Sequence, residues 1–140
     1  MQRSDIEALL SRHHAAFERR DAAALASHHR PDGTFSSPAQ GTVTGRAAIE
    51  RVYKYWFDAF PDMRFTWAPP LIDGDQAALF WSLSGTVGGP FFGMASPGAK
   101  VEMQGAARYT FRDGGIAAAT HVFDFSAALL KAGVLKAKPA

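Results

Sequence analysis

Apolar positions recur at helical spacing through the first sixty residues of the 140-residue chain. The first series predicts a helix that ends near Arg20: Ile6, Leu9 or Leu10, His13 and Phe17. Ser4 and Glu7 fit the S-x-x-E capping box at its start. Asp21 can cap a short second helix, DAAALASHH, which Pro31 closes.

A third helix is predicted after Thr44-Gly45, and Pro61 ends it. Its apolar stripe is rich in aromatic residues: Ile49, Val52, Tyr53, Trp56, Phe57 and Phe60. The opposite side of this helix is charged, as expected for a helix that packs on a core. Between the second and third helices, the segment from Gly33 to Pro38 indicates a short strand.

From Phe65 onwards the pattern is typical of β-strands. Four strands are predicted, over residues 65–72, 77–87, 100–111 and 116–123. Short Asp-Gly connections before the second and the fourth of them favour hairpins. Helices first and hairpins later predict one α+β domain over residues 1–140, with a twisted antiparallel sheet that carries the helices on one face.

Composition narrows the classes of function. A chain with 47% hydrophobic residues and no cysteine can form a core, and it has neither a disulfide framework nor a thiolate metal site. No apolar run reaches the ~18 residues of a membrane span, and the N-terminus is too charged for a signal peptide, so we expect a cytoplasmic protein. The net charge of +2 is mild and dispersed, which favours a solvated surface over a nucleic-acid interface.

Small side chains occupy the middle of the last two predicted strands: Gly105, Ala106 and Ala107 in one, and Ala117, Ala118 and Ala119 in the other. Such residues leave space beneath the aromatic third helix. Either larger neighbours fill that space, or the sheet and the helix enclose an apolar cavity of the kind that binds small ligands. We favour the cavity, because the aromatic stripe is large enough to cover it.

The connection over residues 88–98 is rich in glycine and proline, yet it holds Phe91, Phe92 and Met94. These side chains are poorly explained as parts of an exposed loop. We expect the connection to fold over the end of the sheet as a lid, although a dimer contact would bury them equally well.

Asp124 stands at the end of an apolar strand, where a carboxylate is costly to desolvate unless it is paired or used. It can N-cap a C-terminal helix that Gly133 ends. It can also act as a general acid/base in the cavity, because an apolar surround tunes a carboxyl group for that role. The two roles are compatible. Strict alternation places His121 and Asp124 on opposite faces, so they converge only if the strand bulges or ends near Phe123.

The other histidines are expected to be structural. His13 lies on the apolar stripe of the first helix and is interpreted as a core histidine, whereas His14, His28 and His29 are expected at a helix surface or terminus. The sequence has no cluster with metal-ligand spacing, no P-loop, no G-x-G-x-x-G and no G-x-S-x-G elbow. We therefore expect neither a metal nor a cofactor.

Three blocks of sequence carry a family resemblance: GRAAI at 45–49, FGMASPGAKVEM at 92–103 and DFSAALLKAGVL at 124–135. With the order of helices before strands, they resemble the SnoaL-like polyketide cyclase (ester cyclase) branch of the nuclear transport factor 2-like superfamily. The resemblance covers nearly the whole chain. It implies a cone of helices and a strongly curved antiparallel sheet around a deep apolar pocket, with a short C-terminal helix and commonly a homodimer through the sheet.

For the site, the resemblance implies that Asp124 is the acid/base of an intramolecular aldol ring closure that needs no metal or cofactor. His121 falls where the family often has a polar His or Asn. Ketosteroid isomerases share the superfamily, but Ser37 and Ala107 stand where their general-base and oxyanion-hole aspartates would fall. Because neither residue is acidic, isomerase chemistry of that type is not expected.

The expected function is that of a SnoaL-like cyclase, or a related cofactor-free lyase or isomerase, acting on a small, largely apolar carbonyl compound. Asp124 and His121 are the expected catalytic residues. The expected substrate-binding residues are Phe35, Tyr53, Trp56, Phe60, Trp81, Phe92, Met94, Met103 and Tyr109. Two alternatives stay open: a binding protein that holds a small apolar ligand without chemistry, and a dimeric interaction domain. Neither a nucleic acid nor a membrane is an expected partner.

Overall fold

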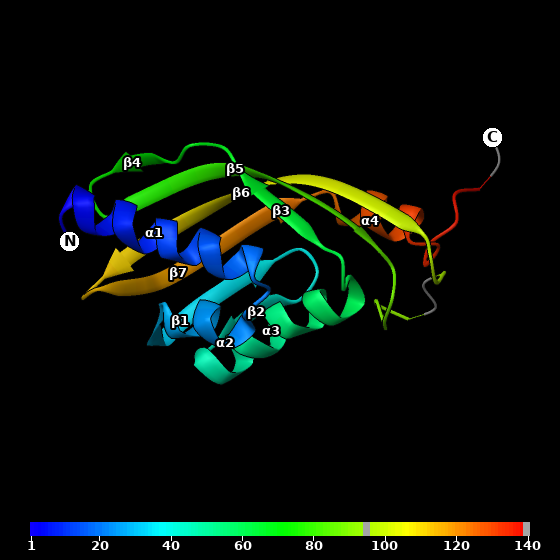
Figure 1. Ribbon diagram of the computed structural model, residues 1–140, viewed down its shortest axis with the longest axis horizontal. Helices are drawn as coiled ribbons and strands as arrows, with labels where there is room; N and C mark the ends of the chain where they lie inside the picture. The colour runs from blue at the N-terminus through cyan, green and yellow to red at the C-terminus, as the bar shows by residue number, and fades with distance from the viewer. Residues whose placement is uncertain (94–95, 139–140) are drawn as a thin grey trace.

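The computed structural model describes residues 1–93 and 96–138, which form a curved sheet with helices along its open side (Figure 1). Three helices come from the first half of the chain and one follows the last strand: α1 (Arg3–Glu18), α2 (Ala22–Ser27), α3 (Arg46–Ala59) and α4 (Phe125–Lys131). The strands are β1 (His29–Ser37), β2 (Gly41–Thr44), β3 (Arg64–Trp67), β4 (Leu71–Asp73), β5 (Gln76–Thr86), β6 (Lys100–Arg112) and β7 (Gly115–Phe123).

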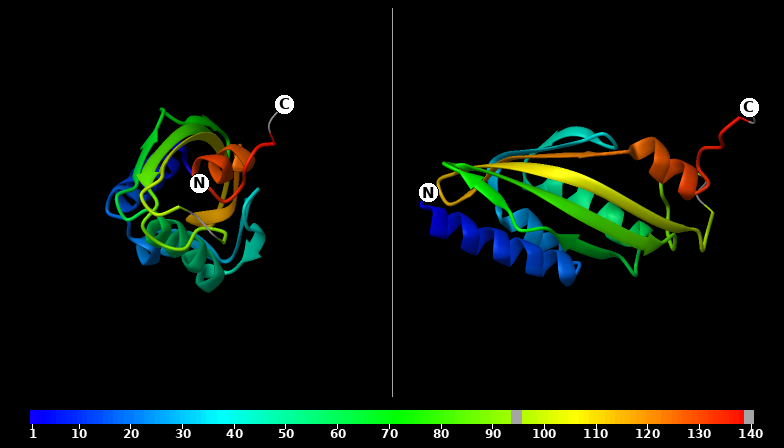
Figure 2. Two further views of the ribbon diagram at one scale, coloured as in Figure 1. Left: turned by 90° about the vertical axis from the view of Figure 1, so that its right-hand side faces the viewer. Right: turned by 90° about the horizontal axis from the view of Figure 1, so that it is seen from above.

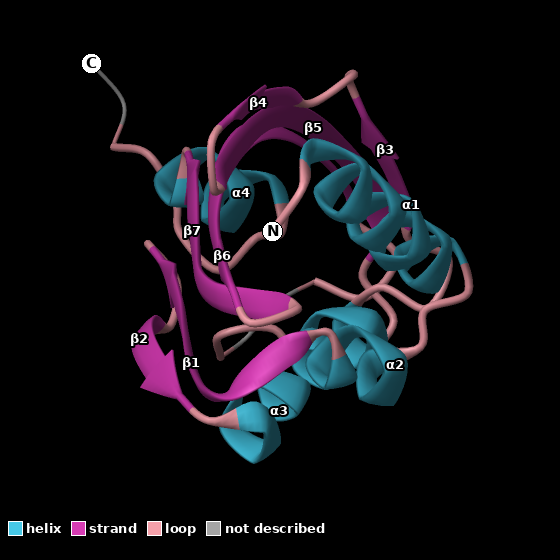
Figure 3. Cartoon of the chain, turned by 90° about the vertical axis from the view of Figure 1, so that its left-hand side faces the viewer, coloured by secondary structure: helices cyan, strands magenta, loops and turns pink. Residues whose placement is uncertain are grey.

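The sheet has the order β2-β1-β7-β6-β5-β3, and β4 pairs with the other end of β5. All neighbouring strands are antiparallel except β1 and β7, which are parallel, so the sheet is mixed. Figures 2 and 3 show the sheet bending round strongly, with α1, α2 and α3 on its open side and α4 at one end. The α+β cone expected from the sequence is confirmed.

The start of α1 differs from the prediction. The helix begins at Arg3, so Ser4 and Glu7 lie inside it and the capping box assigned to them is wrong. Gln2 is the N-cap, and its backbone N–H donates to the carboxylate of Asp5 at 3.1 Å. Asp5 stands three residues after Gln2 and satisfies the N–H that the helix leaves free there.

Two strand predictions are also revised. The single strand expected over 65–72 is broken into β3 and β4, because Pro69 and Pro70 have no N–H with which to continue a ladder. The segment expected to begin at Gly33 starts earlier, at His29, and continues to Ser37. Its antiparallel partner β2 follows at once, a strand that the sequence pattern did not reveal.

The core lies between the concave face of the sheet and the helices. Strand β6 alternates as its sequence predicts, with Val101, Met103 and Tyr109 buried and Glu102 and Arg108 exposed. The aromatic stripe of α3 faces the same core. Because a strand and a helix each bury one side, the space where the two meet is lined almost wholly by apolar side chains. This space holds the candidate site.

Candidate functional site

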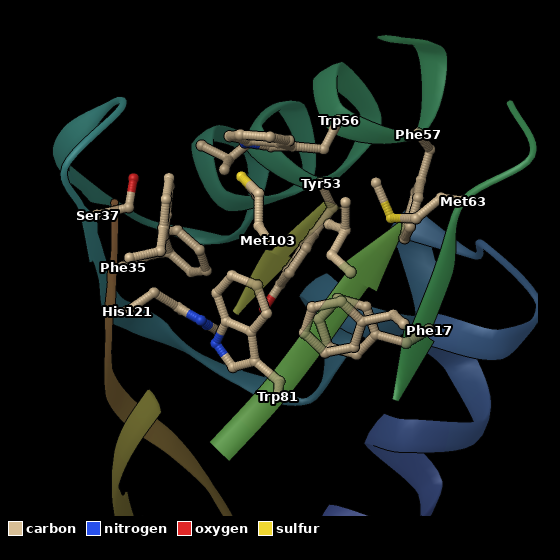
Figure 4. A pocket seen from close by; sticks show the side chains of 14 residues that line it. Phe17, Phe35, Ser37, Tyr53, Trp56, Phe57, Met63, Trp81, Met103 and His121 are labelled. Carbon is tan, nitrogen blue, oxygen red and sulfur yellow. The ribbon is translucent and has the colours of Figure 1, made fainter. Parts of the chain in front are cut away.

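A cavity of about 60 Å³ lies between α3 and the concave face of the sheet (Figure 4). Its lining is mostly aromatic and aliphatic and comes from α1, α3 and strands β1, β3, β5, β6 and β7: Phe17, Phe35, Ser37, Val52, Tyr53, Trp56, Phe57, Met63, Phe65, Trp81, Leu83, Met103, His121 and Phe123. Ligand pockets usually measure roughly 300–1,000 Å³. The space enclosed here is therefore narrow, and a ligand of ordinary size must displace some of the lining.

Two nitrogen atoms form the polar end of this cavity. Among the described residues, neither His121 Nε2 nor Trp81 Nε1 has a hydrogen-bond partner, although both atoms are buried. Their ring centroids are 6.0 Å apart, and Figure 4 shows the nitrogen-bearing edges of the two rings turned toward one another. A buried donor or acceptor without a partner is destabilising. A ligand oxygen placed between the two rings would give both nitrogens a hydrogen-bond partner.

The strand geometry explains why both side chains point into the cavity. On β7, His121 stands opposite Ala107 of β6, and Phe123 stands opposite Gly105. Gly105 leaves room for Trp81, since an added Cβ would collide with that indole and would come within 2.6 Å of the Val122 carbonyl oxygen. The Trp81 indole thus fills part of the space that the small residues of β6 leave, and the cavity is the part that remains open.

Burial sets the protonation state of His121. The side chain is only 6% exposed, and desolvation lowers its pKa to about 4. At neutral pH the imidazole is uncharged, with one nitrogen that donates and one that accepts a hydrogen bond. Trp81 Nε1 can only donate. The pair can therefore bind a carbonyl, enol or hydroxyl oxygen.

Asp124 lies elsewhere. Its carboxylate is exposed and accepts a hydrogen bond from the Ala127 N–H at 3.0 Å, as the N-cap of α4. It lines a separate groove with Glu102 and Lys131, and Met103 is the residue that this groove and the cavity share. Strict alternation holds to the end of β7, so the structure brings His121 into the cavity and leaves Asp124 outside it.

Five of the expected substrate-binding residues line the cavity: Phe35, Tyr53, Trp56, Trp81 and Met103. Phe60 and Tyr109 are fully buried in the core but do not line it. Phe92 is half-buried against Trp56 and Phe125, and its backbone N–H donates to Tyr55 Oη at 2.6 Å. Met94 lies outside the described residues.

Several lining residues were not assigned to the site from the sequence. Val52 and Phe57 belong to the aromatic stripe of α3, and Phe123 follows His121 at strand spacing, so their patterns could have indicated them. No local pattern indicates that Phe17, Met63 or Phe65 reach the cavity, because they do so only where α1, β3 and the connection before β3 fold against its side.

The histidines correct one further expectation. His13 is a core histidine, as predicted, and His28 is half-buried at the end of α2. His29, expected at a helix surface or terminus, is completely buried as the first residue of β1. The strand begins there because its backbone pairs with β7 next to Ile116, which draws the side chain into the core.

The described part of the chain contains no group of three or more histidine, aspartate or glutamate side chains that could hold a metal ion. Within the same residues, no helix combines the length and hydrophobicity needed to cross a membrane.

Comparisons with known proteins identify the family and agree with the fold. The family model of the SnoaL-like domain matches residues 10–119. A comparison with curated proteins found no match. Among solved structures, AclR of Streptomyces galilaeus, a candidate hydroxylase, has a TM-score of 0.83 and 24% identity over 99% of this chain and 87% of that chain.

Two more solved structures extend the likeness. Wild-type IdmH of Streptomyces antibioticus, a candidate polyketide cyclase, has a TM-score of 0.75 and 24% identity over 91% of this chain and 97% of that one. A Catenulispora acidiphila protein with a ketosteroid isomerase-like fold, solved in complex with trimethylamine, has a TM-score of 0.74 and 20% identity over 89% and 92% of the two chains. At these identities the likeness to solved structures shows the fold alone. The family model matches more than half of the chain, and this match shows the family. The protein therefore belongs to the SnoaL-like domain family and has the α+β cone fold of nuclear transport factor 2-like proteins.

Proposed function

We propose that the cavity binds a small, largely apolar carbonyl compound and that the protein catalyses proton transfer at the carbon next to the carbonyl group, without a cofactor. The observation that carries this proposal is the pair of unpartnered nitrogens, His121 Nε2 and Trp81 Nε1, at the polar end of an otherwise apolar cavity. Membership of the SnoaL-like family supports it, and so does the likeness to IdmH, a candidate cyclase of polyketides.

The Trp81 N–H donates to the carbonyl oxygen of the bound ligand, and the rings of Phe35 and Trp56 cover its apolar body. When a proton leaves the neighbouring carbon, negative charge develops on that oxygen. A fixed donor in an apolar cavity stabilises this charge more strongly than water would. His121 donates a hydrogen bond from one ring nitrogen to the same oxygen.

Asp124 is the second proposed proton acceptor, on the pattern of the family. In the structure Met103 stands between its groove and the cavity. Methionine is unbranched and adapts its shape easily. A ligand that displaces the Met103 side chain would enlarge the narrow cavity, and a shift of the β6 backbone at Met103 would then open it toward the Asp124 carboxylate. The proposal thus gives His121 the ligand oxygen and Asp124 the carbon-bound proton.

Hydrogen–deuterium exchange of 2-tetralone, a two-ring ketone with acidic protons beside its carbonyl group, tests this function. The exchange at C1 is followed by proton NMR in D₂O with and without the protein. We expect the wild type to accelerate it, and His121→Asn or Asp124→Asn to slow the catalysed rate by ~10²-fold or more, as for loss of an acid/base group. A wild type no faster than an equal concentration of unfolded protein would overturn the catalytic proposal.

A non-catalytic binding protein is the second candidate function. The trimethylamine complex of the Catenulispora acidiphila protein favours it, since that related fold holds a small molecule in its structure. The same experiment separates the two candidates. If 2-tetralone quenches the fluorescence of the cavity tryptophans but its protons do not exchange, the protein binds the ketone without chemistry.

We also propose a homodimer through the outer face of the sheet. Phe80, Ala106 and Val122 stand side by side in register on β5, β6 and β7. The side chains of Phe80 and Val122 are 69% and 56% exposed, and with Ala106 they form an apolar row across three strands. A second copy of the chain would cover this row by the two-fold symmetry that most soluble dimers have.

A further inference from the structure

Four polar side chains from four elements of the fold form a continuous chain through the core. His28 Nδ1, at the end of α2, lies 2.8 Å from His13 Nδ1 on α1. His13 Nε2 lies 3.4 Å from Tyr53 Oη on α3, which lies 2.8 Å from His29 Nε2 on β1. The bonded pairs are 15 to 40 positions apart along the chain, so only the tertiary fold assembles this array.

The chain of groups runs from solvent to the cavity. His28 is half-buried at the molecular surface, whereas His13 and His29 are completely buried. Tyr53 lines the cavity, and in Figure 4 its hydroxyl end points toward the side where His121 and Trp81 stand. The array thus joins a solvated imidazole to the wall of a space that is otherwise apolar.

Burial keeps every member of the array uncharged. Desolvation lowers the pKa of His13 well below its ordinary value and that of His29 to about 3, and it raises the pKa of Tyr53. Desolvation lowers the pKa of His28 as well, Arg12 and Arg19 lower it further and Asp21 raises it, while Arg46 adds to the lowering at His29. A charge placed on any inner member is therefore costly, so a proton can pass through the array but cannot rest there.

The pairing of atoms allows two complete arrangements of hydrogens. In the first, His28 Nδ1–H donates to His13 Nδ1, His13 Nε2–H donates to Tyr53 Oη, and Tyr53 O–H donates to His29 Nε2. In the second, every one of these bonds runs the other way. Each imidazole has one donor and one acceptor nitrogen in both arrangements, as a neutral histidine must. The two arrangements differ by the shift of one proton at each link, together with a proton gained at His28 Nε2 and a proton lost from His29 Nδ1.

We propose that this array is a proton relay between the cavity wall at Tyr53 and the solvent at His28, which replaces a proton that a bound ligand takes from the Tyr53 hydroxyl group. The proposal rests on the proposed function for its purpose, but the relay is a property of the fold. When a ligand takes the Tyr53 hydroxyl proton, His13 Nε2 passes its proton to Tyr53 Oη. His28 Nδ1 then passes its proton to His13 Nδ1, and water protonates His28 Nε2. One proton enters, one leaves, and no charged residue remains inside.

The exchange of imidazole N–H protons with water tests the relay directly. In protein labelled with ¹⁵N-histidine, the exchange rates of His13 and His29 are measured by saturation transfer from water at neutral pH. We expect His28→Phe, which removes the solvent end, to slow both rates at least 10-fold. Tyr53→Phe removes one hydroxyl group, and we expect it to slow His29 at least 10-fold while His13 keeps its rate.

His14→Phe is the matched control, because His14 is the neighbouring α1 histidine and stacks on Trp67 outside the array. We expect it to leave both rates unchanged. Unchanged His13 and His29 rates in His28→Phe would overturn the relay, since exchange would then proceed by local opening. Equal loss at His13 and His29 in Tyr53→Phe would also overturn it.

These outcomes are independent of 2-tetralone. If the wild type fails to exchange the ketone protons while His28→Phe slows the imidazole protons, the proposed function fails and the relay stands. If the ketone exchanges but the imidazole rates do not respond, the relay alone is wrong.

Discussion

His121 and Asp124 are three residues apart in the sequence and face opposite sides of the structure. His121 lines the cavity, whereas Asp124 is exposed and caps α4. The separation follows from the regular alternation of β7, which continues to Phe123 without a bulge near its end. The structural role of Asp124 is therefore directly visible, and the catalytic role proposed for it depends on a shift of β6 at Met103.

The cap can be separated from any catalytic role by two substitutions. Asp124→Ala removes the side-chain oxygen that accepts from the Ala127 N–H, and we expect it to lower the free energy of unfolding by about 1 kcal/mol. Asp124→Asn keeps an acceptor at the cap and should unfold at nearly the wild-type urea concentration. If both variants lose the same stability, the carboxylate charge matters more than the hydrogen bond.

Gly105→Ala tests the packing that shapes the cavity. The added Cβ would collide with the Trp81 indole and with the backbone of β7, and the sheet cannot move aside. We expect a loss of about 1–3 kcal/mol in the free energy of unfolding, as for other overpacked cores. The tryptophan emission should shift as the indole leaves its place. A variant with wild-type stability and emission would mean that the indole does not lie against β6.

Acid should destabilise the protein through its buried histidines. His121 has a pKa of about 4 in the folded chain and 6.5 when unfolded, so between these values only the unfolded chain takes up the proton. The free energy of unfolding that the neutral His121 side chain contributes is fully present above pH 6.5. It is lost as the pH falls toward 4, by about 3 kcal/mol for this residue alone. His29, with a folded pKa of about 3, acts in the same direction.

Urea unfolding at pH 7.5, 6 and 5 measures this dependence. The wild type should unfold at progressively lower urea concentrations, and His121→Phe should show a smaller loss over the same range because the variant cannot take up that proton. An equal loss in both proteins would show that other groups control the acid sensitivity.

The proposed dimer predicts a dependence on the apolar row of the outer face. Phe80→Glu places a charge at the centre of the contact, and we expect sedimentation to change from dimer to monomer. Ala23→Glu is the control, since Ala23 is exposed on α2, on the open side of the sheet and away from the row. A wild type that sediments as a monomer at high concentration, or a Phe80→Glu protein that remains a dimer, would contradict the interface.

Much of the fold could be predicted from the sequence because its signals are local. The stripe on α3, the alternation of β6 and the Asp-Gly turns each depend on residues a few positions apart. The start of α1 differs from the prediction because Gln2 is not one of the residue types that usually cap a helix. The break between β3 and β4 follows from Pro69 and Pro70, which the apolar pattern alone does not take into account. The parallel pairing of β1 with β7 joins distant segments, so no local pattern reports it.

The candidate site was predicted in part for the same reason. Tyr53, Trp56 and His121 belong to elements with clear periodicity, and each of them lines the cavity. Phe17 enters from another helix, and its place depends on how α1 packs across the sheet. The array of His13, His28, His29 and Tyr53 is wholly tertiary, and His29 was expected at a helix surface or terminus.

The central claim is that His121 and Trp81 hold the oxygen of a ligand inside the cavity. The most direct measurement is the ¹⁵N chemical shift of the His121 imidazole while 2-tetralone, and in parallel tetralin, is added to the protein. Tetralin has the same rings without the carbonyl oxygen. We predict that 2-tetralone moves the His121 nitrogen signals and that tetralin does not. Binding of 2-tetralone that leaves these signals unchanged would contradict the account.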